Sequence, residues 1–360
     1  MFQPALRVRI LLMALLVCLM SGARAPAWDE DGHATVTRLA IDAMPETMPA
    51  WLRSPAVRAR LVYLAPEPDR WRGQDHRILN HVNGPEHYFD VEDLADFGLG
   101  LDTLPPLRRQ FLDILATRRA LQPEQFKPRN VKKDKAYTAL VPGLLPYRIA
   151  EVQWKIAANW TELKTYLAHR DRVSDAMIQN ARDNIVYYMG ILGHYVGDGA
   201  QPLHLTRHHH GWQGENPKGY TTDHGFHSMI DSGVIRLHGI YYDTLKNRVR
   251  PARKIPRGAA WQETCRYLGE SYRVVEPLYA LEKSGKLKQT EGKQFIEDRL
   301  LAASSMLAGL WVAARDAAIM DDFRAERLMK EYPKELGMSP KKRAARVRTT
   351  GSVSHAARAR

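Results

Sequence analysis

Cysteine is almost absent from this chain, which has 360 residues and two cysteines. Cys18 lies in an N-terminal segment that we expect to be removed, so Cys265 alone is expected in the mature protein. The sequence therefore excludes a disulfide within the mature chain.

Long apolar runs are also missing. A membrane-spanning helix needs about 20 apolar residues, and the run from Ile10 to Met20 is too short. Two arginines precede this run, and small-residue cleavage sites that end at Ala25 and Ala27 follow it. This pattern predicts a signal peptide over residues 1–27 and an exported protein, secreted or periplasmic, without stable membrane insertion.

Acidic residues are missing from both ends of the chain, which accounts for most of the net charge of +13. The signal segment contributes three positive charges and residues 340–360 contribute seven, which leaves +3 for residues 28–339. The nearly balanced body gives little support for a polyanionic partner. We interpret residues 331–360 as a basic disordered tail.

Internal repeats, Gly/Ser linkers and strand-like alternation are scarce, and the composition is that of a globular protein. Apolar spacing of three and four residues predicts long helices over Ile149–Leu167, Ile178–Val196 and Phe295–Ile319. Asp29 or Asp31 can cap a first helix, and Ser174 can cap the second long one. We predict an all-α fold with one domain over residues 28–330. Residues 122–147 and 208–220 are expected to be surface excursions.

Histidine and aspartate recur at spacings that packing does not require. In His194-x-x-x-Asp198 the two side chains lie on one helix face, about 6 Å apart. His204 follows, and His227-x-x-x-Asp231 repeats the pair. One such pair is usually a surface hydrogen bond. Two pairs and a further histidine predict metal ligands in a shared cleft.

Trp28 and His33 extend this set if processing ends at Ala27. The free amine and carbonyl oxygen of Trp28 could then chelate one ion, to which His33 could return. The alternative is a buried tryptophan that anchors the N-terminus and a histidine that caps a helix.

These spacings resemble the superfamily that joins zinc-dependent single-strand nucleases with bacterial zinc phospholipases C. Residues Trp28 to His33, His194 to His204 and His227 to Asp231 carry the resemblance, with Asp69-Arg70-Trp71-Arg72 and His87-Tyr88 at two further family positions. The resemblance covers residues 28–320 and implies a helical fold with a trinuclear zinc cleft.

Nine residues would hold three Zn²⁺ ions if the family roles transfer. The implied sets are Asp69, His87 and His194 for the first ion, His204, His227 and Asp231 for the second, and Trp28, His33 and Asp198 for the third. Imidazole and carboxylate ligands suit zinc.

Several residues depart from the family pattern. Asp75, His76 and His81 are rival ligands between Asp69 and His87. His208, His209, His210 and His224 add imidazoles near the second set, which we interpret as loop residues or as residues that support the ligands without binding metal. Residues 97–147 form an insertion without a role that the pattern explains.

The resemblance implies phosphodiester hydrolysis by a zinc-bridged hydroxide. Asp69 would orient this nucleophile and accept its proton, and Arg72 would stabilise charge on the phosphate oxygens. No Gly-x-Ser-x-Gly motif suggests a serine nucleophile.

The substrate is less constrained by the sequence. Asp231 matches the nuclease branch, where the phospholipases have glutamate, and Tyr88 could stack on a base. We therefore expect an endonuclease for single-stranded DNA or RNA. A zinc phospholipase C and a non-catalytic exported zinc-binding protein are the alternatives, and the cation Arg72 beside Asp69 disfavours the second of these.

Overall fold

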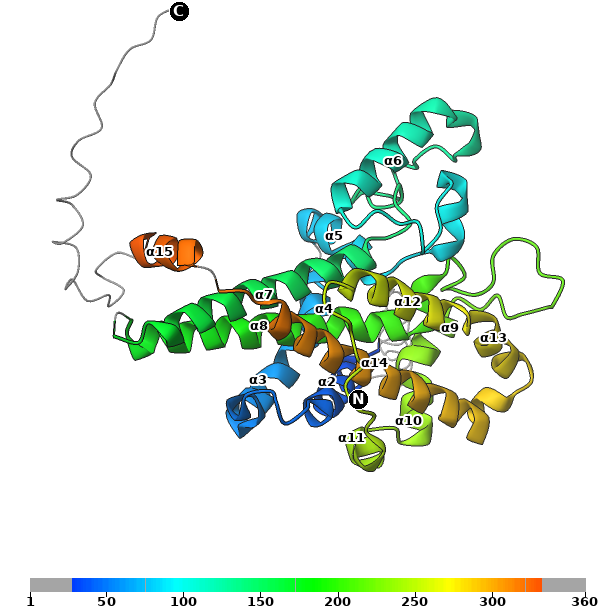
Figure 1. Ribbon diagram of the computed structural model, residues 1–360. Coiled ribbons are helices and arrows are strands. Elements are labelled where there is room, and N and C mark those ends of the chain that lie inside the picture. The colour runs from blue at the N-terminus through cyan, green and yellow to red at the C-terminus, as the bar shows by residue number, and fades with distance from the viewer. Residues whose placement is uncertain (1–27, 75, 172, 321, 332–360) are drawn as a thin grey trace, which may run out of the picture.

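The computed structural model describes residues 28–74, 76–171, 173–320 and 322–331 (Figure 1). These residues are mainly helical and form no β-strand, with one isolated antiparallel bridge between Phe89 and Gly143. The prediction of a mainly helical fold is thus confirmed. The predicted signal peptide and all but the first residue of the predicted tail lie outside the described residues.

Helices of widely different length make up the described chain. The α-helices are α2 (Glu30–Ala43), α3 (Pro55–Leu64), α4 (Glu67–Arg72), α5 (Arg77–Asn83), α6 (Arg108–Leu121), α7 (Leu145–Ala168), α8 (Asp175–Ala200), α9 (Phe226–Ser228), α10 (Val234–His238), α11 (Tyr242–Leu245), α12 (Ala260–Tyr272), α13 (Val275–Lys283), α14 (Thr290–Ala317) and α15 (Asp322–Glu331). The shorter helical turns are η1 (Ala50–Arg53), η2 (Gly84–His87), η3 (Val91–Phe97), η4 (Pro123–Gln125), η5 (Pro202–Leu205), η6 (Met229–Gly233), η7 (Lys246–Arg248) and η8 (Lys286–Lys288).

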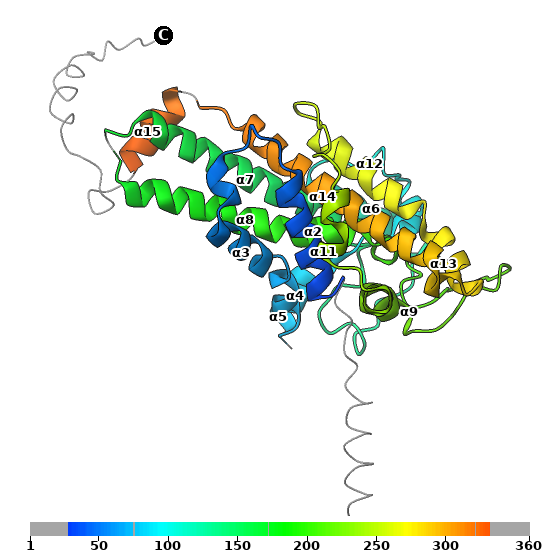
Figure 2. The same cartoon turned by 90° about the horizontal axis from the view of Figure 1, so that it is seen from below.

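The three long helices expected from apolar spacing are α7, α8 and α14, and they pack together with α2 and α3 (Figures 1 and 2). The side chain of Ser174 caps α8 by accepting a hydrogen bond from the amide of Met177, and Asp29 caps α2. Every residue of α8 from Met189 to Ala200 is buried. The C-terminal half of α8 is therefore the central helix around which other elements gather.

Most of the predicted insertion, residues 97–144, forms a lobe that contains α6 and projects from the helical body (Figure 1). Residues 122–144 are mostly exposed and lack long helices, in agreement with the expected excursion. The excursion ends earlier than expected, because α7 begins at Leu145, and Leu145 and Tyr147 are buried. None of the described helices combines the length and apolar content needed to cross a bilayer.

Candidate metal centre

The last turns of α8 place His194 and Asp198 on one buried helix face. His194 Nε2 lies 3.4 Å from Asp198 Oδ2, as their i, i+4 spacing requires. Both side chains are fully buried. The Nδ1–H of His194 donates to the carbonyl oxygen of Ala65 at 2.9 Å. This bond fixes the tautomer, so the lone pair of Nε2 is available to a metal.

His87 and Asp69 approach this pair from η2 and α4. His87 Nδ1 lies 2.9 Å from His194 Nε2 and 3.1 Å from Asp198 Oδ2. Asp69 Oδ1 lies 3.8 Å from His87 Nδ1 and 3.9 Å from His194 Nε2. The three residues of the first predicted set therefore share one locus, and Asp198 contacts it as well.

The second predicted set is also brought together. His204 lies in η5, His227 in α9 and Asp231 in η6, which is a π-helical turn. His227 Nε2 is 3.0 Å from His204 Nε2 and 3.2 Å from Asp231 Oδ2. The Nδ1–H of His204 donates to the carbonyl oxygen of His87, which aims Nε2 of His204 at the other two ligands.

His33 joins the cluster from the first turns of α2. Its Nε2 lies 3.4 Å from Asp198 Oδ1, and its ring stacks on His194 with centroids 4.0 Å apart. Asp198 thus has one oxygen toward His33 and the other toward His87 and His194. The two oxygens of Asp198 therefore face different histidines of the cluster.

Trp28 is fully buried, and its indole Nε1–H donates to the carbonyl oxygen of Gly197 at 2.9 Å. The next residue, Asp29, donates its backbone N–H to the carbonyl oxygen of Asp231 at 3.3 Å. The main chain at Trp28 is therefore held between α8 and η6. The indole anchors the N-terminal segment, as the alternative interpretation expected, and the role of the Trp28 amine and carbonyl oxygen as ligands stays a prediction.

The donor atoms are spaced as zinc ligands would be. Zinc bonds of 2.0–2.1 Å in tetrahedral geometry put neighbouring ligand atoms about 3.3 Å apart. Several polar atoms of the cluster are buried without a hydrogen-bond partner among the described residues, including His87 Nε2, Asp198 Oδ1 and Asp231 Oδ2. Buried carboxylate oxygens are costly without a hydrogen bond or a cation. Three groups of His and Asp could hold a metal ion: His33, Asp69 and His194; His87, His194 and Asp198; and His204, His227 and Asp231.

Burial sets the protonation of these ligands in the metal-free protein. It lowers the pKa of His204 to about 3, and it holds the pKa values of His194 and His227 well below the usual range. Burial also raises the pKa of Asp69 to about 6, opposed by the nearby Arg72, and it raises the pKa of Asp198 well above the usual range. Neutral imidazoles are ready to bind a cation, whereas the carboxyl groups must first release protons.

The cluster reaches solvent on the side of Asp69, Arg72 and His227, whose side chains are 13%, 18% and 11% exposed. Arg72 Nη2 contacts Asp69 Oδ1 at 3.0 Å. The two predicted catalytic residues are therefore in direct contact at the edge of the cluster. The guanidinium of Arg72 thus lies beside the carboxylate of Asp69 where the cluster meets solvent.

Tyr88, the predicted substrate-binding residue, is partly buried beside His87. Burial raises the pKa of its hydroxyl, and the nearby carboxylates of Asp90, Asp134 and Asp93 raise it further. Asp134 and Asp93 are in turn paired with Arg129 and Arg207, so the charge beside the ring is largely compensated.

The rival histidines lie apart from the buried cluster. His76 and His81 are exposed, and His81 Nδ1–H donates to the carbonyl oxygen of Ala136. Asp75 lies outside the described residues. The ring of His208 stacks on Trp212.

Three further histidines lie near the second set. His209 and His210 have ring centroids 6.1 and 5.5 Å from that of His227, and His224 lies 6.3 Å from His210. They surround the open side of the second set, as expected of loop residues, and belong to none of the three groups.

Gln201 is a site residue that the sequence pattern did not identify. The side-chain Nε2–H of Gln201 donates to Asp231 Oδ1 at 2.7 Å, and its side-chain Oε1 accepts a hydrogen bond from the backbone N–H of Leu203. Gln201 thus orients a ligand of the second set while it shapes the turn that carries His204. The sequence offered one signal for Gln201, which is its position between the candidate ligands Asp198 and His204. A polar side chain at such a position is expected to face those ligands.

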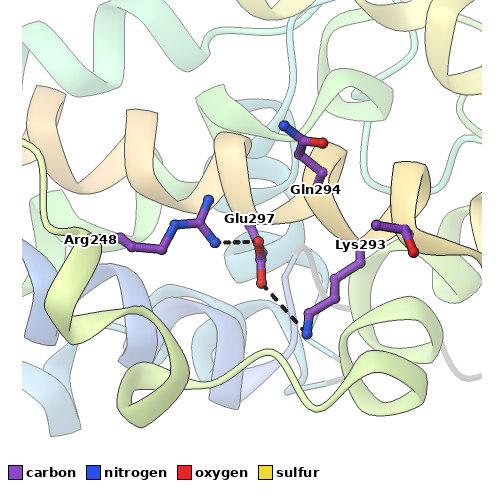
Figure 3. Close-up of a pocket in the computed structure, with 5 residues that line it drawn as sticks. Arg248, Lys293, Gln294 and Glu297 are labelled. Carbon is purple, nitrogen blue, oxygen red and sulfur yellow. Dashed lines mark hydrogen bonds and ion pairs between the residues drawn. The ribbon is translucent and has the colours of Figure 1, made fainter.

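A separate pocket lies beside α14 and is lined by Arg248, Thr290, Lys293, Gln294 and Glu297 (Figure 3). Arg248 and Lys293 both pair with the buried carboxylate of Glu297. The lining contains none of the clustered histidines, and its charges are satisfied internally. The pocket therefore adds nothing to the metal centre.

No family model matches this chain, and no curated protein matches its sequence. The resemblance inferred from motif spacing therefore stays a prediction.

Proposed function

We propose that this protein is an exported zinc-dependent phosphodiesterase. The observation that carries the proposal is the meeting of three mostly buried His/Asp groups, two of which share His194, with an arginine at their solvent-facing edge. A purely structural metal site gains nothing from a cation beside its ligands. An anionic substrate gains a planar donor that can bind two of its oxygens.

Zinc at these positions would supply a water activated at neutral pH and positive charge for the departing oxygen. The chain's own groups would orient the reaction. Asp69 Oδ1 would accept the proton of the attacking water, and Arg72 would hold the phosphate and stabilise its growing negative charge. His194 and His204 would be held rigid by their bonds to backbone carbonyl oxygens.

Single-stranded DNA or RNA and a phospholipid are the two candidate substrates. Asp231 in place of glutamate favours the nuclease branch, whereas the partial burial of Tyr88 limits it as a base-stacking platform. A non-catalytic zinc protein would show the same ligands without turnover.

The test uses the purified mature protein in zinc-loaded, chelated and zinc-restored forms. Each form is assayed on single-stranded DNA, RNA, a choline phospholipid and a soluble diester, bis(p-nitrophenyl) phosphate. We expect close to three zinc ions by elemental analysis and turnover that is lost on chelation and regained with zinc. Fewer than two tightly held ions, or no zinc-dependent turnover of any diester, would contradict the proposal.

A further inference from the structure

The short helix α5 has its apolar and polar faces reversed. Ile78, Leu79 and Val82 are 67%, 36% and 50% exposed, whereas Asn80 and Asn83 are buried. A surface helix normally turns its apolar residues toward the core. A group of exposed aliphatic side chains marks a surface that binds a partner.

A loop of the insertion lies against α5. His81 of α5 donates a hydrogen bond to the carbonyl oxygen of Ala136 at 2.8 Å, and the rings of His81 and Tyr137 are 6.5 Å apart. Figures 1 and 2 both show the loop that follows α6 near α5. Arg129 donates to Asp134 and closes the loop into a compact turn.

The tip of this loop is both apolar and basic. Val131 is 65% exposed at the tip, and Tyr137 is 51% exposed nearby. Tyr137 has a φ of 58°, a left-handed conformation that a bulky residue rarely adopts. Arg129 covers one face of the Tyr137 ring at 4.1 Å. The strained backbone therefore holds an aromatic side chain outward.

Five exposed cations accompany these apolar residues: Arg77, Lys127, Lys132, Lys133 and Lys135. No ion pair joins any of the five to a carboxylate within the described part of the chain. Their positive charge is thus available to an external anion.

This surface adjoins the metal centre. Helix α5 packs against α4, which carries Asp69 and Arg72, and it leads directly into η2, which ends at His87. Whatever binds α5 is therefore brought to the side of the centre that is open to solvent.

We propose that α5 and residues 127–137, which we call the docking surface, bind the surface of an anionic lipid bilayer. Exposed aliphatic side chains beside lysines fit an interface where acyl chains meet anionic headgroups. Nucleic acid fits less well, since Ile78, Val82 and Val131 are aliphatic and the ring of Tyr137 is covered on one face by Arg129. The inference rests on the proposed phosphodiesterase function for its purpose, because docking would present a lipid phosphodiester to Arg72.

The experiment measures co-sedimentation of the zinc-loaded protein with vesicles of phosphatidylcholine and phosphatidylglycerol at 7:3. The Ile78→Ser/Val82→Ser double variant is expected to bind at least about tenfold more weakly, because each lost aliphatic group removes a buried contact. Replacing Lys132, Lys133 and Lys135 by glutamine should weaken binding by about fivefold per lysine. Zinc content and thermal unfolding establish that each variant is folded.

Matched controls come from other faces of the molecule. Leu167→Ser/Leu237→Ser removes two exposed leucines, and glutamine at Lys155, Lys254 and Lys288 removes three exposed lysines. Both controls should bind vesicles as the parent does.

The failure of docking and the failure of catalysis are distinguishable. Hydrolysis of soluble bis(p-nitrophenyl) phosphate by the parent tests the reaction without a bilayer, whereas co-sedimentation measures the vesicle-bound fraction directly. Parent and docking-surface variants that bind vesicles equally would overturn the inference. Loss of affinity for a single-stranded oligonucleotide, with vesicle binding unchanged, would overturn it in favour of nucleic acid.

Discussion

Arg72 is the residue at which metal binding and catalysis can be separated. It contacts Asp69 but supplies no ligand atom, so Arg72→Ala should leave zinc content and thermal stability nearly unchanged. Turnover should fall by about 10²–10³, the usual cost of removing a preorganised donor. Arg72→Lys should restore little, because a point charge cannot form the two-pronged contact. Parallel kinetics and zinc analysis check this, and a fully active Arg72→Ala enzyme would reject the assigned role.

The raised pKa of Asp69 predicts how zinc affinity depends on pH. Because its folded pKa is raised to about 6, the metal-free protein holds a proton there that zinc must displace at lower pH. Zinc affinity should therefore fall by about tenfold per pH unit below pH 6 through this proton. The buried imidazoles contribute little, since their lowered pKa values keep them neutral in this range.

The effect on the fold itself has the opposite sign. In the metal-free protein, a raised carboxyl pKa gives stability that is present below the unfolded value of 3.8 and lost as the pH rises through about 6.

Competition with a zinc chelator from pH 5 to 8 measures how zinc affinity depends on pH. Asp69→Asn is the control, with weaker binding and a shallower slope. An equally steep slope in that variant would assign the proton to another residue.

At the scale of elements, the site depends on how closely α2 approaches α8. A methyl group on Gly197 would lie 2.7 Å from His33 Nδ1, and one on Gly193 would lie 2.8 Å from Thr37 Oγ1. Both glycines face α2, so the absence of side chains lets the helices meet. The buried His33 can then reach Asp198.

Gly197→Ala should therefore have two opposing effects: alanine favours the helical backbone, and its methyl group clashes with His33. Alanine favours a helix over glycine by about 1 kcal/mol, but the clash with His33 must be relieved by moving this ligand. We expect loss of about one zinc ion per chain and a lower unfolding temperature. Gly269→Ala in α12 is the control, because its methyl group would meet only the ends of two flexible side chains, Leu101 at 3.3 Å and Arg273 at 3.8 Å. Unchanged zinc content in Gly197→Ala would show that His33 is not a ligand.

The long helices could be predicted because their apolar spacing and caps are local signals, as for α8 and its cap Ser174. The i, i+4 spacing likewise predicted that His194 and Asp198 share a face. The π-helical turn that carries Asp231 could not be predicted, because its extra residue arises from packing. Nor could the link from Gln201 to Asp231, which joins residues 30 positions apart through a turn.

At the scale of the whole molecule, the metal centre gathers distant parts of the chain around α8. The N-terminal segment, α4, η2, η5 and η6 each supply ligand candidates, and the backbone of His87 and Phe89 is bonded to His204. The spacing of histidine and aspartate along these segments predicted which side chains would gather at the centre. The inward or outward orientation of α5 depended on which neighbours cover it, which no local pattern encodes.

The N-terminus gives the sharpest test of this assembly. Trp28 is buried against α8, and its backbone lies next to Asp231 through Asp29. If the free amine of Trp28 binds an ion, one extra alanine ahead of it turns the amine into an amide without a lone pair to donate. That protein should keep about two zinc ions and lose turnover.

Trp28→Phe at the exact N-terminus keeps the amine but loses the indole bond to Gly197, so it should keep three ions with lower thermal stability. Elemental analysis, with the N-terminus established by mass spectrometry, distinguishes the two roles. Three ions and full activity in the extended protein would assign Trp28 to anchoring alone and leave His33 and Asp198 to bind their ion without it.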